Sequence, residues 1–123
     1  MKISKDDFLK MQEKYDKEVK KGKPAKDKKN KDIDNQTNWV FFDKKTLQDI
    51  LDKADNVKGG IKFYMTEYTD ETAQEMHPEN PDEYVGRLTL VLSPTTLEAS
   101  TGIGDPEEEY YNKGASCPPN CEI

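Results

Sequence analysis

The chain has 123 residues, of which 36% are charged and 33% hydrophobic, and its formal net charge is −6. A chain of this length is expected to form one domain, and its acidic balance argues against nucleic acid as the main partner, because neutralising phosphates needs a basic surface. No apolar run approaches the ~20 residues that cross a bilayer, and the first residues lack the apolar core of a signal peptide, so we expect a soluble cytoplasmic protein without a membrane partner.

Residues 1–22 are predicted to form an amphipathic helix. Ser4 is a suitable N-cap, and Gly22, followed by Pro24, ends the pattern. The helix carries one narrow apolar stripe, which is too thin to be stable alone in water. It must therefore dock either on the body of the same chain or on another chain. The stripe consists of Phe8, Met11, Tyr15 and Val19.

A charged linker is predicted over residues 23–37, which offer little to bury and should be mobile. The first 37 residues hold 12 Lys against 8 Asp and Glu, whereas the rest of the chain holds 7 Lys and Arg against 17 Asp and Glu. A basic arm joined to an acidic body can fold back on it or reach an acidic neighbour. The simpler alternative is that both are solvated surfaces.

The core domain is predicted over residues 38–104, as strand, helix, strand and strand. "NWVFFD" is typical of a strand, and Asp43 can cap the helix that follows. Two further strands are expected at 61–68 and 84–93, with alternating apolar residues, and residues 95–105 could add a short fourth strand. Residues 69–83 are expected to form a polar loop between them.

This order predicts an α+β fold with a small three- to four-stranded sheet. We expect one helix to cross over one face of the sheet in a right-handed connection and to bury Leu51 against Phe63. The N-terminal helix is expected to cover the opposite face, which carries Tyr64, Tyr68 and Val91.

Candidate catalytic groups are few. His77 lies among carboxylates in the polar loop, but its spacing fits no known metal site, and no nucleophile is placed beside it for base catalysis. The carboxylates of Asp43, Glu67 and Asp70 suit structural roles better than a glycosidase pair. Neither glycine-containing loop matches a phosphate-binding motif. The sequence therefore predicts no catalytic residue, no metal ligand and no cofactor.

The tail, residues 105–123, holds an acidic segment with Tyr110 and Tyr111. This segment is expected either to be an exposed recognition element for a basic partner or to fold its tyrosines back on the edge of the sheet; the sequence leaves both open. Together, the N-terminal helix and the tail supply the candidate interaction residues: Phe8, Met11, Tyr15, Tyr110, Tyr111, Pro118 and Pro119.

Both cysteines, Cys117 and Cys121, flank "PPN" at the end of the chain. Pro119 and Asn120 suit a tight turn that would bring the two sulfurs within bridging distance. Such a small loop would stabilise the fold little. The C-x3-C spacing differs from that of thioredoxin-like redox centres, and the neighbouring glutamates oppose thiolate formation.

The segments "WVFFDKKTLQDIL", "GGIKFYMTEY", "LTLVLSPT" and "CPPNC" resemble, in this order, a group of small bacterial proteins. That group shares an aromatic strand, a capped helix, two further strands and a Cys-Pro-Pro-x-Cys end, and the resemblance covers residues 38–121. The group has no established activity, so the resemblance implies no catalytic residue. It implies that the cysteine-containing tail is a shared feature.

Two functional hypotheses follow. The first is a non-enzymatic interaction or assembly protein that binds a protein partner, or itself, through its N-terminal helix, acidic surface and tail. The second is a small redox protein that uses Cys117 and Cys121 as a reversible dithiol.

Overall fold

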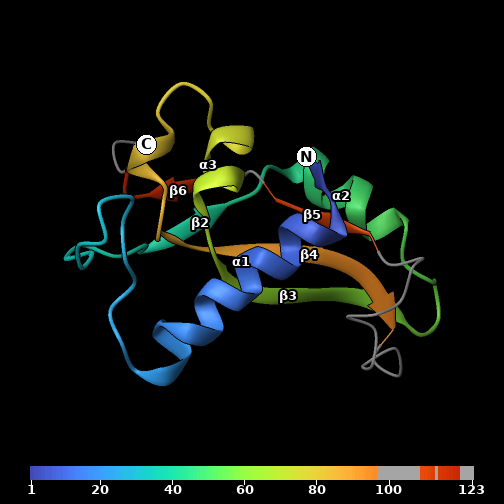
Figure 1. Ribbon diagram of the computed structural model, residues 1–123. Coiled ribbons are helices and arrows are strands. Elements are labelled where there is room, and N and C mark those ends of the chain that lie inside the picture. The colour runs from blue at the N-terminus through green and yellow to red at the C-terminus, as the bar shows by residue number, and fades with distance from the viewer. Residues whose placement is uncertain (97–108, 113, 120–123) are drawn as a thin grey trace.

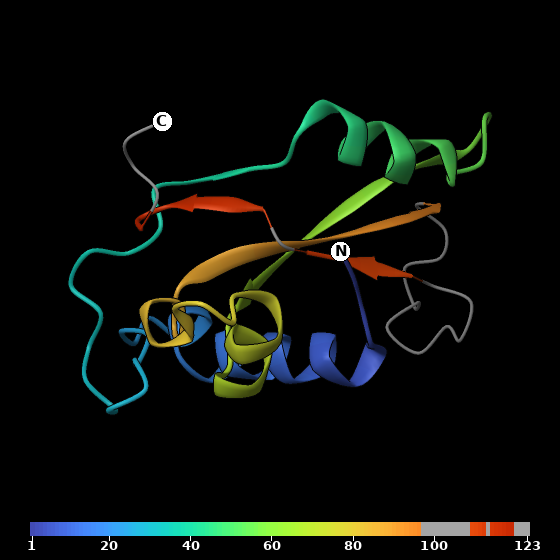
Figure 2. The same cartoon turned by 90° about the horizontal axis from the view of Figure 1, so that it is seen from above.

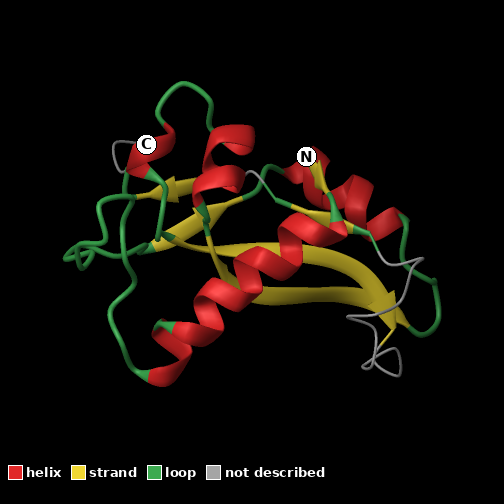
Figure 3. Cartoon of the chain, in the orientation of Figure 1, coloured by secondary structure: helices red, strands yellow, loops and turns green. Residues whose placement is uncertain are grey.

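The computed structural model describes residues 1–96, 109–112 and 114–119, and it confirms the α+β class (Figures 1 and 3). The helical elements are α1 (Lys5–Lys17), the 3₁₀ turn η1 (Val19–Lys21), α2 (Lys44–Asp52), α3 (Asp70–Met76) and the 3₁₀ turn η2 (Pro81–Glu83). The strands are β1 (Lys2–Ile3), β2 (Trp39–Phe41), β3 (Gly59–Glu67), β4 (Leu88–Thr96), β5 (Tyr110–Tyr111) and β6 (Ala115–Cys117).

The strands form two antiparallel sheets. The main sheet has the order β1-β5-β4-β3, and β2 pairs with β6 in a separate two-stranded sheet. Figure 2 shows α1 and α3 on one side of the long β3–β4 pair and α2 with the β2–β6 sheet on the other side. The fold is therefore a main sheet covered unequally on its two faces.

The N-terminal helix docks on its own chain, and this settles the alternative that the sequence leaves open. Ser4 caps α1 by accepting a hydrogen bond from the Asp7 amide. Phe8 and Met11 are fully buried, and the Phe8 ring stacks on Tyr110 with ring centroids 4.3 Å apart and meets Tyr64 edge-on. The predicted cover of the face that carries Tyr64 is confirmed.

A second apolar cluster lies under α2. Asp43 caps this helix through the Thr46 amide, as predicted. Ile50 is buried against Leu92 of β4 and Tyr111 of β5. Partly buried residues complete this cluster: Phe42, Leu47, Ile61 and Leu90.

Two expectations about this side are wrong. The strand before α2 does not lie in the main sheet, because β2 pairs with β6 and β5 takes the place beside β4; α2 therefore joins two sheets and makes no crossover within one. Leu51 and Phe63 are not buried, since 49% and 53% of their surfaces are exposed. The helix buries Ile50 over β4 and β5 and leaves much of β3 uncovered.

The segment expected to be a polar loop contains α3. Thr69 and Thr72 form a reciprocal capping box at its start, which satisfies two of the free amides of the first turn. Ala73 and Met76 of α3 are buried in the same cluster as Phe8.

The segment expected to be a mobile linker makes specific contacts with the body. Ala25 is buried, and the Gln36 side chain donates to the Gly86 carbonyl and accepts from the Leu88 amide. The Thr37 hydroxyl donates to the Leu88 carbonyl over 2.6 Å. Residues 23–37 therefore form an arm that is fixed to the body near Lys26 and again near Thr37.

The described parts of the tail also belong to the body, because β5 joins the main sheet and β6 joins β2. The four segments expected from the sequence thus contribute to one packed unit. In the segment 95–105, where the sequence suggests a further strand, Thr95 and Thr96 belong to β4 and residues 97–105 lie outside the described part.

The buried Phe8 and the half-exposed Leu51 are expected to respond differently to truncation to alanine. We expect Phe8→Ala to lower the free energy of unfolding by about 3–5 kcal/mol, because it removes a fully buried ring. Leu51→Ala should cost about 1 kcal/mol or less, because half of this side chain is already in water. Urea denaturation of both variants measures the difference, and equal losses would contradict the burial described above.

Candidate interaction surface

Most interaction residues expected from the sequence lie inside the protein. Phe8, Met11, Tyr110 and Tyr111 are buried, so they cannot form a surface that a partner contacts, and this part of the hypothesis is wrong for the folded chain. Their physical role is to fill the core. Three candidates remain half-buried: Tyr15, Pro118 and Pro119.

A different surface exposes large apolar side chains. Phe63 and Met65 on β3 are 53% and 48% exposed, and Leu51 on α2 is 49% exposed. Phe63 and Met65 share one face of β3 with Ile61, because side chains alternate along a strand, and Ile61 packs in the α2 cluster. The two exposed side chains therefore continue that apolar face beyond the part that α2 covers.

Leu51 points toward the same region. On the other side of α2, Lys53 lies over the Tyr111 ring at 5.4 Å and pairs with Glu109, so that side of the helix faces β5. Ile50 marks the buried side. With 100° between successive helical residues, Leu51 lies on the side opposite Lys53, which faces β3. We call Leu51, Phe63 and Met65 the open face.

The open face continues into an apolar pocket between the arm and the sheet. Its volume is about 200 Å³. Met65, Leu88 and Leu90 form its floor on the main sheet, and Trp39 and Val40 of β2 form a wall with Thr37 and Asn38. This pocket offers room for a side chain beside the open face. Phe41, which is also exposed, lines a separate cavity with Met1 and Phe42.

The bulge before β4 determines which backbone groups of β3 point outward. Gly86 has φ +83°, its amide donates to the Tyr68 carbonyl, and the Tyr68 amide donates to the Arg87 carbonyl. This is a glycine-type bulge, which requires glycine at the left-handed position. At Gly86 a Cβ atom would also meet the Lys26 carbonyl oxygen.

Hydrogen bonding then alternates along the pair, so Thr66 and Tyr64 direct their backbone groups toward β4. Ile61, Phe63 and Met65 direct theirs away from it. Among the described strands, β3 has a neighbour on one side only. Its outer edge therefore presents N–H and C=O groups from the same residues whose side chains form or adjoin the open face.

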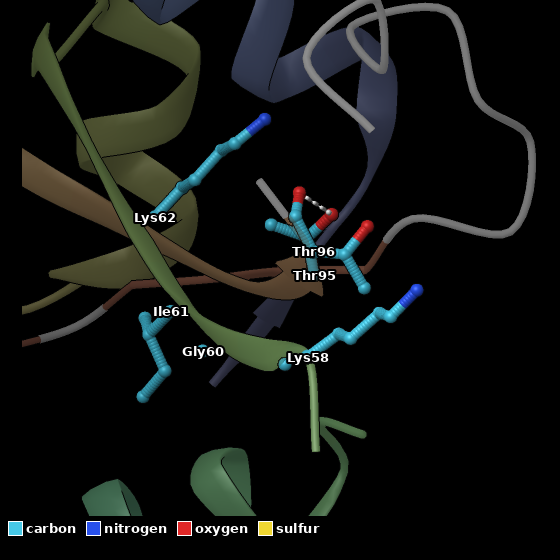
Figure 4. Close-up of a pocket in the computed structure, with 7 residues that line it drawn as sticks. Lys58, Gly60, Ile61, Lys62, Thr95 and Thr96 are labelled. Carbon is cyan, nitrogen blue, oxygen red and sulfur yellow. Dashed lines mark hydrogen bonds between the residues drawn. The ribbon is translucent and has the colours of Figure 1, made fainter. Parts of the chain in front are cut away.

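The opposite face of β3 is polar near its start. Figure 4 shows Ile61 and Lys62 pointing to opposite sides of the strand, with Ile61 on the side of α2. Lys58, Lys62, Thr95 and Thr96 line a shallow cavity there. Lys62 thus adds positive charge on the far side of the edge that carries Phe63.

His77 belongs to a hydrogen-bonded network in the core. Its Nε2 lies 3.0 Å from the Tyr68 hydroxyl, and its ring stacks on Tyr84 at 3.5 Å. Tyr68 donates to Asn112 Oδ1, and Asn112 in turn donates to Thr89. Burial raises the pKa of Tyr68 above its ordinary value. The network connects α3, β3, β4 and the end of β5, a structural role that the sequence does not signal.

The three carboxylates considered from the sequence have different positions and roles in the structure. Asp43 caps α2, Asp70 lies exposed in the first turn of α3, and Glu67 is fully buried against α1, where its oxygen lies 3.5 Å from Lys14 Nζ. Within the described residues, no group of three or more His, Cys, Asp or Glu side chains is placed to hold a metal ion.

Cys117 ends β6 and is 6% exposed. It is disulfide-bonded, and the peptide bonds on both sides of Pro118 are cis. Cys121, the other half of the pair expected from the sequence, lies outside the described residues.

The disulfide gives a direct test. Iodoacetamide should leave Cys117 unmodified in denatured, unreduced protein and modify it after reduction, because the thiolate is the reactive species. Peptide mass spectrometry of the two samples measures this, with Cys117→Ser as the control. Alkylation of Cys117 without reductant would contradict the structure.

No known protein-family model, curated protein or solved structure matches this chain. In the described part of the chain, every helix is too short or too polar to cross a membrane.

Proposed function

We propose that this chain is a non-enzymatic protein-binding module that takes an extended segment of a partner along the outer edge of β3. The single observation that carries the proposal is the coincidence on Phe63 and Met65 of an outward-directed backbone and an exposed apolar side chain. A free strand edge pairs readily with another extended chain, and the side chains beside it select which chain binds.

The surface also specifies the chemistry of the partner. A segment paired with β3 places alternate side chains over the open face, where apolar residues would cover Phe63 and Met65 and one could enter the pocket floored by Leu88 and Leu90. Its other side chains lie on the opposite face of β3, which is polar near the start of the strand. The proposed ligand is therefore an extended segment that alternates apolar with polar residues.

This proposal revises the sequence hypothesis in one respect. The apolar stripe of the N-terminal helix is occupied within its own chain, so binding is assigned to β3 and not to α1. The half-buried prolines of the tail follow β6, whose partner β2 contributes Trp39 and Val40 to the pocket wall. The tail strand β6 is thus paired with the strand that lines the pocket.

Selection from a random phage-displayed peptide library tests the proposal without a known partner. We expect enriched peptides to show the alternating pattern and to bind the parent protein, and we expect Phe63→Lys and Met65→Lys to weaken binding at least about tenfold. A lysine on an edge strand opposes pairing. Val57→Lys is the matched control, because Val57 is 88% exposed and precedes β3. Unfolding curves establish that all three variants fold.

Enriched peptides that bind Phe63→Lys and the parent equally would contradict the proposal. Sedimentation equilibrium of the parent protein tests whether a second copy of this chain, and not an extended peptide, pairs with the edge of β3. A concentration-dependent dimer that Phe63→Lys abolishes would assign the edge to self-assembly in place of an extended peptide.

The dithiol alternative has one observation in its favour, the disulfide at Cys117. Against it, the tail segment that holds this residue is paired with β2 and largely buried. A redox titration that finds the disulfide in equilibrium with a cellular thiol buffer would favour this alternative.

A further inference from the structure

Glu67 is a buried carboxylate with an incomplete set of partners. It is the last residue of β3, and none of its side chain is exposed. Neither of its oxygens accepts a hydrogen bond within the described part of the chain. An ionised carboxylate in this position loses its hydration without full compensation, which is costly.

The nearest cation cannot supply the missing bond. The Lys14 ammonium donates at 2.9 Å to both oxygens of Glu18 and to the Lys26 carbonyl. An ammonium has three N–H groups, so these contacts use all of its donors. Lys14 therefore attracts Glu67 across 3.5 Å without a hydrogen bond.

The second carboxylate is well satisfied. Glu18 accepts from Lys14 and, over 2.8 Å, from the Lys26 amide. Burial opposes its charge, but these two donors outweigh burial and hold the pKa of Glu18 below its ordinary value. For Glu67, burial and the nearby Glu18 raise the pKa to about 8, against the smaller opposing effect of Lys14. The raised pKa favours the protonated form of Glu67 at neutral pH, and its O–H would then be available to Glu18.

This cluster fastens the arm to the body. Lys26 is held from both its amide and its carbonyl, by Glu18 and Lys14 respectively. The Lys23 amide also donates to the Glu18 carbonyl. Four further charged side chains, together with Thr69, line the cavity of about 430 Å³ outside the cluster: Lys10, Glu13, Lys17 and Glu71.

We propose that Glu67, Glu18 and Lys14 form a proton-operated latch on the arm, closed while one proton lies between the two carboxylates and open when that proton is lost to water. When the proton leaves, two adjacent carboxylates share one ammonium, and separation of Glu18 from Glu67 relieves their repulsion. Since Glu18 and Lys14 hold Lys26, the start of the arm separates with them. This inference does not depend on the proposed binding function.

The raised pKa of Glu67 determines how opening of the latch depends on pH. The closed form of Glu67 has a raised pKa and the open form an ordinary one, so the proton favours the closed form. Closure is strongest where Glu67 holds its proton and Glu18 is still ionised, and it weakens as pH rises between about 4.5 and 8. Each pH unit in this window should increase the opening constant about tenfold, and above about pH 8 the change should level off.

Amide hydrogen exchange at Lys26, read by NMR and corrected for intrinsic rates, measures the opening. We expect protection to fall about tenfold per pH unit between pH 5 and 8 in the parent. Glu67→Gln, which keeps a donor toward Glu18 and cannot ionise, should remove this slope. Glu71→Gln is the matched control, since Glu71 lines the outer cavity, and it should keep the slope.

A carbon-13 titration of the Glu67 carboxyl in the unmodified protein needs no variant. A midpoint near 8 supports the latch, and a midpoint near 4.5 overturns it. Constant protection of Lys26 while Glu67 titrates near 8 also overturns it, because the proton would then have no effect on the arm.

Discussion

The two tyrosines of β5 join the two apolar clusters of this fold. Tyr110 stacks on Phe8 in the cluster under α1, and the next residue, Tyr111, packs with Ile50 in the cluster under α2. Successive side chains of a strand point to opposite faces, so a strand of two residues serves both sides of the sheet. Asn112 then fixes its position by donating to Thr89 and to the Leu90 carbonyl. Both layers of the protein depend on this short insertion between β1 and β4.

The same insertion explains why one region stays uncovered. Because β5 extends the sheet on one side of β4, the apolar stripe of α2 packs over β4 and β5 through Ile50, Leu92 and Tyr111. The helix then lies too far from the opposite edge to cover Phe63 and Met65. The placement of one helix therefore accounts for the exposed apolar side chains of β3.

The sequence predicts local features well and long-range pairing poorly. The caps Ser4 and Asp43 and the alternation along β3 follow from local chemistry, and the cover of Tyr64 by the first helix follows from matching two apolar patterns. The position of β5 does not, since two adjacent tyrosines show no periodicity. Helix α3 is short, and the sequence signals it only weakly. The signal consists of the capping pair Thr69 and Thr72, followed by the apolar Ala73 and Met76. Nothing local reveals that Glu67 is buried, because its surroundings come from α1, more than 45 residues earlier in the chain.

Strand β3 carries two features that oppose stability. Phe63 and Met65 leave apolar surface in water, and Glu67 removes a carboxyl group from it. Other local choices agree with the fold, from the capped helices to the glycine at the bulge, but Phe41, Leu51 and Val57 are also exposed. Departures from consistency are expected where a structure serves function as well as stability, and β3 brings two kinds of departure together on one strand. Phe63 and Met65 belong to neither buried cluster, so the core itself does not require them. Under the proposed function, their exposed surface is the part that a segment paired with β3 would cover.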